Sequence, residues 1–230
     1  MRPRIADLLA HGARAAVSAA ALALLPTYFA PVAAAGLFLA IFVLVHDLAH
    51  GALGLPRRIN ELALAAGGVL IVTSGHGMRL VHLRHHARTL TDDDLEGTSA
   101  RMGFLEACAA APRLALAARV RGFMDARPRE RRWQAAEHVA CAALAVTALV
   151  GPAWLGVYLA VALIAQVAAP VWAGHVPHRM PAWMVRAARA VAATGSVTAL
   201  SLGYHDLHHA RPKVPTFALA RVAQEVSETR

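Results

Sequence analysis

The 230-residue chain is too apolar for an ordinary soluble domain, because 57% of its residues are hydrophobic where roughly 45–50% is usual. Its formal net charge is +9 and Lys213 is its only lysine, so arginine supplies nearly all the positive charge. A nucleic-acid binder could carry such a charge. Here, however, the arginines lie between apolar runs of membrane-spanning length, which argues against nucleic acid as a partner. Composition therefore predicts an all-α integral membrane protein, with residues 1–230 forming a single membrane-embedded domain.

The N-terminal part predicts two membrane spans. Residues 15 to about 50 are almost uncharged until Asp47, and Pro26 and Pro31 interrupt them. At about 20 residues per crossing, this stretch holds two spans joined by a tight turn. The apolar run from Ala15 has no small-residue cleavage site followed by a polar chain, so we expect a retained span and not a signal peptide.

The middle of the chain mixes shorter apolar runs with many charges. The run Glu61–Gly75 is shorter than a crossing needs, which predicts a buried, re-entrant or interfacial helix. Residues 92–96 then form an acidic loop, and residues 103–132 combine Ala and Leu with many arginines. That composition predicts an interfacial amphipathic helix followed by a basic linker.

The C-terminal half predicts a second hairpin of spans. We expect one span over Trp133–Val150 and another over Ala153–Trp172, with Gly151 and Pro152 forming the turn. Residues 182–203 make a further apolar stretch, which contains Arg186 and Arg189 near its start. The prediction is thus about four transmembrane helices in two hairpins, with interfacial helices and a histidine-rich cap.

Charge predicts the orientation in the membrane. The turns at 26–31 and 151–153 carry no lysine or arginine, whereas the N-terminus, residues 56–132 and residues 179–189 are rich in arginine. Positive charge favours the cytoplasmic side. We therefore expect a protein of the bacterial inner membrane, with its histidine clusters on the cytoplasmic side.

Three histidine clusters share a helical spacing. His46 and His50 form an HxxxH box, and two HxxHH boxes contain His82, His85 and His86 and then His205, His208 and His209. Residues at i, i+3 and i+4 share one face of a helix. Eight imidazoles exceed what one metal can use, so the count predicts two metals, and imidazole suits iron as well as zinc. The chain has neither the HExxH motif of zinc proteases nor the Glu-x-x-His pair of ferritin-like di-iron sites.

These boxes, lying between hydrophobic hairpins, resemble those of the membrane fatty acid desaturase superfamily. The resemblance covers roughly residues 41 to 220 and extends beyond the boxes. Arg57-Arg58-Ile59-Asn60 follows the first box, acidic residues up to Asp94 follow the second, and Pro212-Lys213-Val214-Pro215 follows the third. The resemblance implies a non-haem di-iron oxygenase with two iron ions, O2 as co-substrate and the box histidines as ligands. No catalytic side chain beyond the metal ligands is predicted.

The family also implies a ninth histidine near the end of the fourth span. His175 and His178 both lie there. His178, between Pro177 and Arg179, resembles the carotenoid ketolase branch of the superfamily. We therefore expect His178 as the ninth metal ligand and retain His175 as an alternative.

Three carboxylates and three single histidines complete the set of candidates. A metal-bound imidazole normally donates its second N–H to a carboxylate or carbonyl, and Asp47, Asp94 and Asp206 are placed to accept it. His11 and His138 are expected at the surface or at an interface. His76, six residues before His82, is a candidate partner of a ligand.

The resemblance implies oxygen-dependent oxidation of a long lipid chain that enters from the bilayer, with fatty acyl desaturation as the leading expectation. A carotenoid ketolase or hydroxylase is the alternative enzyme, because the chain is short for an acyl-lipid desaturase. A histidine-rich metal transporter is the non-enzyme alternative, although transport sites lie near the bilayer midplane. Without a fused haem domain, electrons are expected from a separate donor of ferredoxin or cytochrome type.

Overall fold

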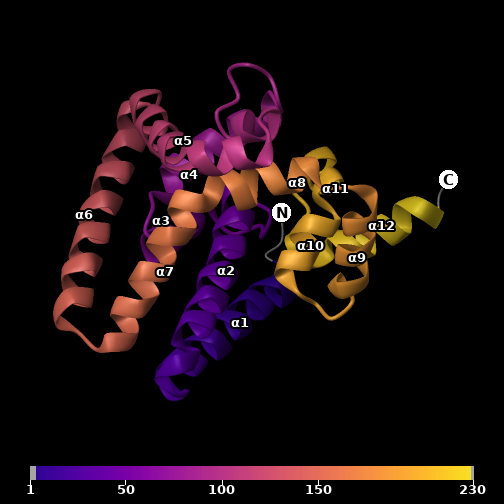
Figure 1. Cartoon of the computed structure of the whole chain (residues 1–230). Coiled ribbons are helices and arrows are strands. Elements are labelled where there is room, and N and C mark those ends of the chain that lie inside the picture. Colours follow the sequence, from indigo (N-terminus) through magenta and orange to yellow (C-terminus); the bar gives the residue numbers. More distant parts are fainter. Residues whose placement is uncertain (1–3, 229–230) are drawn as a thin grey trace.

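The computed structural model describes residues 4–228, and every regular element in that range is helical (Figure 1). The predicted all-α fold is therefore confirmed. The α-helices are α1 Ile5–Leu24, α2 Ala30–Ala49, α3 Arg57–Leu70, α4 Gly75–Ala87, α5 Phe104–Met124, α6 Pro128–Val150, α7 Ala153–Ala169, α8 Val176–Arg179, α9 Ala182–Ala192, α10 Val197–Gly203, α11 His205–Ala210 and α12 Leu219–Glu228. Short helical turns lie at η1 Thr27–Phe29, η2 Gly97–Arg101, η3 Pro170–His175 and η4 Thr216–Ala218.

Four segments of the described chain are long and apolar enough to cross a membrane, as predicted. They are Ile5–Leu24, Thr27–Ala49, Pro128–Val150 and Ala153–Arg179. The first begins at Ile5 and not near Ala15, and the polar His11 in its first half is buried within the protein. The third begins at Pro128, so arginines lie in its first turns. The fourth continues past Trp172 through the π-helical turn η3 into α8.

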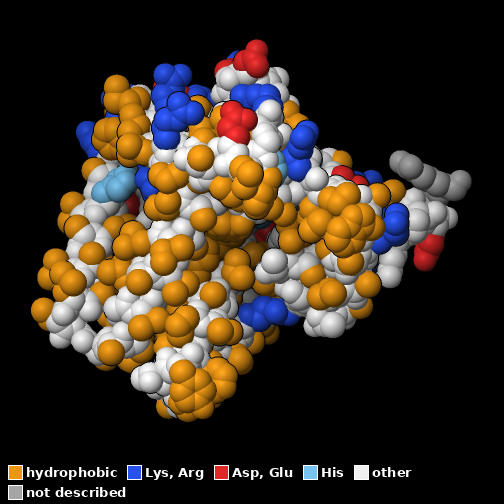
Figure 2. Space-filling view, in the orientation of Figure 1, with side chains coloured by type: hydrophobic (Ala, Val, Ile, Leu, Met, Phe, Trp, Pro, Cys, Tyr) orange, Lys and Arg blue, Asp and Glu red, His pale blue; other side chains and the backbone are white. Residues whose placement is uncertain are grey.

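Helix α2 forms the centre of the apolar core. Its side chains Ala34, Phe38, Ile41 and Val45 are all buried, and they pack with residues of α1, α3 and α7. The outward faces of the hairpins remain apolar, with Leu149 82% exposed. Figure 2 shows hydrophobic side chains covering the lower hairpins and most charged side chains gathered at the opposite end. Such an arrangement fits a lipid environment, where exposed apolar side chains carry no hydration cost.

Helices α3 and α4 form a bent pair between the two hairpins. Their axes differ by 101° at the short break between them, which agrees with the buried or re-entrant helix expected over Glu61–Gly75. Ser74 caps α4, since its Oγ accepts a hydrogen bond from the Gly77 N–H at 2.9 Å. Gly68 permits the close approach, because a Cβ there would lie 2.7 Å from the Gly75 Cα. The bend places the second histidine box beside the end of α2.

The apolar stretch at residues 182–203 forms two short helices and not a span. Helices α9 and α10 pack against each other, and the turn between them contains Gly195 at φ +76°, a conformation that glycine adopts readily. This helical pair leads directly into α11 and the third box. Figure 1 shows α9 to α12 grouped on the side of the molecule opposite α6.

Candidate metal centre

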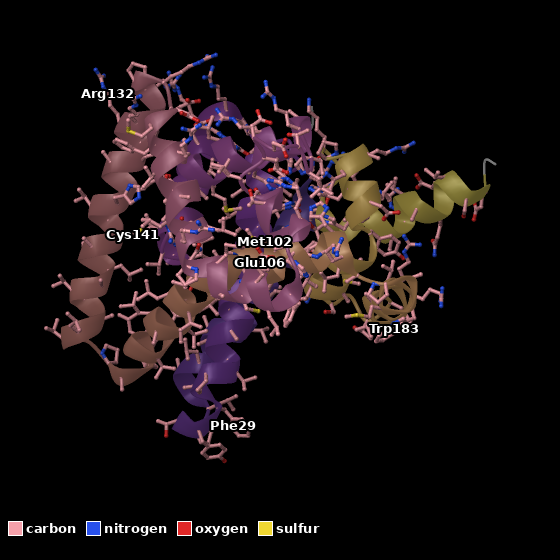
Figure 3. All side chains as sticks on the ribbon, turned by 45° about the horizontal axis from the view of Figure 1, so that its top comes forward. Phe29, Met102, Glu106, Arg132, Cys141 and Trp183 are labelled. Carbon is pink, nitrogen blue, oxygen red and sulfur yellow. The ribbon has the colours of Figure 1, made fainter. Side chains whose placement is uncertain are left out.

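The three boxes and the end of the fourth span meet at one place. The first box ends α2, the second lies on α4, the third forms α11, and α8 carries His178. Figure 3 shows nitrogen-bearing side chains concentrated where these elements meet, whereas Phe29 lies at the far end of the α1–α2 hairpin. All nine histidines predicted as ligands therefore come from four separate segments into one cluster, which we call the histidine cluster: His46, His50, His82, His85, His86, His178, His205, His208 and His209.

Two groups within the histidine cluster have metal-binding geometry. One ligand atom from each of His46, His50, His82 and His208 lies within 4.8 Å of the others, and the same holds for a group of His85, His178 and His209. Four imidazoles can fill the coordination of one ion, and three leave positions open. The count of two metal sites expected from the sequence thus has a counterpart in the arrangement of the side chains.

His86 and His205 adjoin these two groups. The His86 Nε2 lies 3.0 Å from the His208 Nε2, and its ring stacks on His209 with centroids 4.2 Å apart. The His205 Nε2 lies 3.1 Å from the His209 Nε2 and 3.2 Å from the His178 Nε2. These inward nitrogens converge on each other, as they would on shared cations. The donor set therefore fits two metal ions of the kind that imidazole binds.

The outward nitrogens of two imidazoles contact acceptors on the acidic loop. The His85 Nδ1 lies 2.7 Å from an Asp94 oxygen, as the sequence predicted for Asp94. The His82 Nδ1 lies 2.9 Å from Glu96 Oε1. Sequence reasoning missed Glu96, because several carboxylates follow the second box and their spacing does not show which one turns inward. Such contacts fix the tautomer and ring orientation of a metal ligand.

Asp47 connects the first box to both ends of the chain. It lies 3.6 Å from the His46 Nδ1, and it accepts hydrogen bonds from the Thr216 N–H at 3.0 Å and the Thr216 hydroxyl at 2.9 Å. His11 lies 3.1 Å from the same carboxylate and is 1% exposed. His11 was expected at the surface or at an interface, and the structure instead buries it within the protein, because α1 begins early enough to include it.

Two other expectations need correction from the geometry. The Asp206 side chain is 75% exposed and pairs with Arg189 at 3.3 Å, so within the described chain it contacts no imidazole. Its place one residue after His205 turns it away from the cluster. His76 lies between Glu137 at 2.7 Å and Glu61 at 2.8 Å, outside both metal-binding groups.

The remaining histidines have their own partners. His175 is buried, but its Nδ1 lies 2.8 Å from the Ser99 carbonyl oxygen, and it belongs to neither group. The structure thus places His178 and not His175 within the histidine cluster. His138 is exposed, as expected, with its Nδ1 2.6 Å from the Gln134 carbonyl oxygen.

The environment keeps the imidazoles of the third box neutral. Burial and the neighbouring imidazoles lower the pKa values of His205 and His208, and they lower the pKa of His209 to about 3. Burial opposes ionisation of Asp94, but hydrogen bonds from His85 and from the Gly97 and Leu90 backbone hold its pKa at about 2. The neutral imidazoles of the third box are ready to bind a metal, because binding there need not displace protons.

A cavity of about 480 Å³ passes the histidine cluster. Its lining includes His46, His82, His205 and His208, and most of the remaining side chains are apolar, among them Phe42 and Trp172. The lining continues beyond the cluster in two directions. One side is formed by α5, α6 and α7, and the other by α10 and α12. Figure 1 shows these two sets of helices on opposite sides of α2.

Comparison with known proteins agrees with the histidine cluster. A family model described as fatty acid desaturase matches residues 20–230. Searches of curated proteins and of solved structures gave no significant match. The family match covers nearly the whole chain, including all three boxes. The chain therefore belongs to the fatty acid desaturase family.

Proposed function

We propose that this protein is an oxidoreductase that uses two iron ions and O2 to desaturate a long fatty acyl chain. The observation that carries the proposal is the apolar cavity that passes the histidine cluster and continues on both sides of it. Such a cavity holds the middle of a long chain at the metals, with both ends extending away. Desaturation of an acyl chain takes place at internal carbons of this kind.

The residues of the histidine cluster divide between the two ions. His46, His50, His82 and His208 would hold one ion, and His85, His178 and His209 the other. His86 and His205 lie next to these groups and would complete the coordination. Bound iron supplies the redox chemistry with O2 that an unactivated C–H bond requires, which acid–base side chains do not provide.

The other contributions come from the protein itself. Asp94 and Glu96 hold the outward nitrogens of His85 and His82, which would keep the inward nitrogens directed at bound ions. The apolar lining excludes water and binds the lipid chain by burial alone. Desaturation together with reduction of O2 to two waters needs two electrons from outside, and a separate donor of ferredoxin or cytochrome type fits that need.

The location of the cluster also supports the membrane setting. The cluster lies at the ends of the spans, on the same side as the arginine-rich segments, and Figure 3 shows Arg132 at the end of α6 far from Phe29. Positive charge favours the cytoplasmic side, so we place the site at the cytoplasmic face of a bacterial inner membrane. A transporter would need the cluster near the middle of the bilayer.

The test is lipid and pigment profiling of a bacterial host that expresses the gene. We expect new double bonds in fatty acyl chains, and no such products from a His208→Ala variant expressed to the same level. The host should also make carotenoids, so that both substrate classes compete in one cell. Oxidised carotenoids with unchanged fatty acids would replace the acyl proposal with the ketolase alternative.

A further inference from the structure

One side of the cavity contains an arginine in otherwise mainly apolar surroundings. Where α5, α6 and α7 form the lining, Leu114, Ala115 and Ala118 accompany the half-buried Arg119. The neighbouring polar lining residues of these helices are Gln134, His138 and Gln166. None of the predicted metal ligands lies on these helices, so this polar group is separate from the histidine cluster.

Arg119 is held by an amide and not by an acid. Its Nη2 donates to Gln166 Oε1 at 3.3 Å, and the Gln166 Nε2 in turn donates to the Ile71 carbonyl oxygen at 2.7 Å. Both ends of the Gln166 amide are thus engaged, which fixes the direction in which it holds the guanidinium. Gln166 is a positioning residue for Arg119.

No acidic side chain of the described chain pairs with Arg119. The carboxylate in the cavity lining is Glu96, and it contacts His82. Other arginines behave differently: Arg79 pairs with Glu61 at 2.9 Å, and Arg84 pairs with Asp125 at 2.5 Å. An unpaired cation within apolar surroundings is costly and marks a functional site in membrane proteins.

The free donors of Arg119 indicate what it binds. A guanidinium has five N–H donors, and Gln166 accepts from only one of them. The remaining donors suit an oxygen acceptor, and a carboxylate best of all, because the guanidinium can form two parallel hydrogen bonds with it. An acceptor oxygen at the end of an apolar chain would meet Arg119 while the chain lies along the cavity.

We propose that Arg119, oriented by Gln166, binds an oxygen-bearing end of the lipid substrate on the α5–α7 side of the cavity. The proposal rests on the proposed function, since it concerns the same cavity. The acceptor is the carboxylate of a free fatty acid or the neutral oxygen of a hydroxylated lipid. Either group would fix the chain at one end, so the span between Arg119 and the histidine cluster would set which carbon is oxidised.

Equilibrium dialysis with metal-free protein in detergent tests this proposal without catalysis. The probes are palmitate, 1-hexadecanol and hexadecane, which share a chain length and differ in the end group. We expect wild-type protein to bind palmitate most tightly and Arg119→Gln to weaken that binding by about tenfold or more, as loss of a charged hydrogen bond implies. Hexadecane binding should stay unchanged.

1-Hexadecanol distinguishes the two possible acceptors, the carboxylate of a fatty acid and the neutral oxygen of a hydroxylated lipid. A loss confined to palmitate supports a carboxylate, and a comparable loss for 1-hexadecanol supports any acceptor oxygen. The matched control is Arg113→Gln, because Arg113 lies exposed on the same helix and does not line the cavity. Equal palmitate affinity in wild type and Arg119→Gln, or equal weakening of all three probes, would overturn the proposal. The same loss in Arg113→Gln would overturn it too.

Two further variants test the proposal even if Arg119→Gln fails to fold. Arg119→Lys retains the charge but not the fork of parallel donors, so an intermediate palmitate affinity is expected. Gln166→Leu should weaken palmitate binding less than Arg119→Gln. If the iron-loaded protein fails to desaturate any lipid while palmitate binding still depends on Arg119, only the proposed function fails. If desaturation occurs and palmitate binding does not depend on Arg119, only the proposed role of Arg119 fails.

Discussion

At the scale of single residues, Asp94 and Asp206 differ in whether they contact the outward nitrogen of an imidazole. Asp94 is 1% exposed, and it accepts hydrogen bonds from His85 at 2.7 Å and from the Leu90 and Gly97 N–H groups at 2.8 and 3.0 Å. Asp206 is exposed and pairs with Arg189. The sequence offered both as partners of a box imidazole, since Asp94 follows the second HxxHH box and Asp206 lies within the third. Only the fold decides which of them reaches an imidazole.

This difference predicts opposite effects of two conservative changes. Asp94→Asn should lower iron affinity by roughly 10–100-fold, because it removes the charge that orients His85. Asp206→Asn should leave iron affinity unchanged and serves as the matched control. Iron retention during dialysis against a chelator measures both. Equal retention in the two variants would remove Asp94 from the support of the metal centre.

His175 and His178 provide a second comparison between near neighbours. The His178 Nε2 lies 3.1 Å from the His85 Nε2, whereas His175 contacts the Ser99 carbonyl oxygen. His178→Ala should therefore lower the iron content of the purified protein. His175→Ala should leave the iron content unchanged and lower the melting temperature, because it removes a buried side chain and its hydrogen bond to the Ser99 carbonyl oxygen. Iron loss in His175→Ala at an unchanged melting temperature would reverse this assignment.

At the scale of elements, the spans and boxes were predictable because their signals are local. Apolar length predicts a crossing, and the i, i+3, i+4 spacing predicts a shared helix face. The 101° bend between α3 and α4 was not predictable in the same way, because it depends on the contact of Gly68 with Gly75. The early start of α1 likewise depends on a partner, Asp47, that lies far along the chain. Contacts between distant segments leave no periodic pattern in a sequence.

The two uncharged turns provide a test of orientation. A reporter inserted at the α6–α7 turn, near Pro152, should be active on the outer side of the membrane, and one fused after Arg230 should be active in the cytoplasm. Paired alkaline phosphatase and green fluorescent protein fusions report the two sides. The reverse pattern at both positions would place the histidine cluster outside the cytoplasm and contradict the proposed orientation.

At the scale of the whole molecule, the sequence predicted which histidines assemble but not how they divide. Nine histidines fitted two metals, yet the grouping of His208 with the first box and of His209 with His85 appears only in the ring contacts that α11 makes with α2 and α4. The sequence also did not predict that Arg119 lines the cavity, because many other arginines lie near it in the sequence. Its partner Gln166 lies on another helix.

The two groups predict the metal content. Protein purified from iron-replete cells should contain about two iron ions per chain, since each group offers at least three imidazoles. Elemental analysis of the purified protein measures this ratio, with a variant lacking His208 and His209 as the matched control. Full occupancy by zinc alone under these conditions would contradict the oxidoreductase proposal.

The crowding of imidazoles predicts how the metal-free protein responds to acid. In the folded state, burial and neighbouring imidazoles lower the pKa of His209 to about 3 and also lower those of His205 and His208, whereas an unfolded histidine has a pKa near 6.5. Between these values the unfolded chain binds more protons than the folded one. Folding stability must therefore fall as the pH drops below about 6.5, and the fall should level off below the folded pKa values.

Thermal melting of the metal-free protein in detergent between pH 7.5 and 5 measures this response. The melting temperature should drop over that range. A variant with His205, His208 and His209 changed to glutamine should show a smaller drop, because it has lost three of the groups that take up protons on unfolding. Bound metal should raise the melting temperature but should not lessen the drop, since metal-bound imidazoles are unprotonated in the folded state and the unfolded chain still takes up protons. A melting temperature that rises on acidification would show that the imidazoles are already charged in the folded state, and a cluster of charged imidazoles could not bind metal at neutral pH.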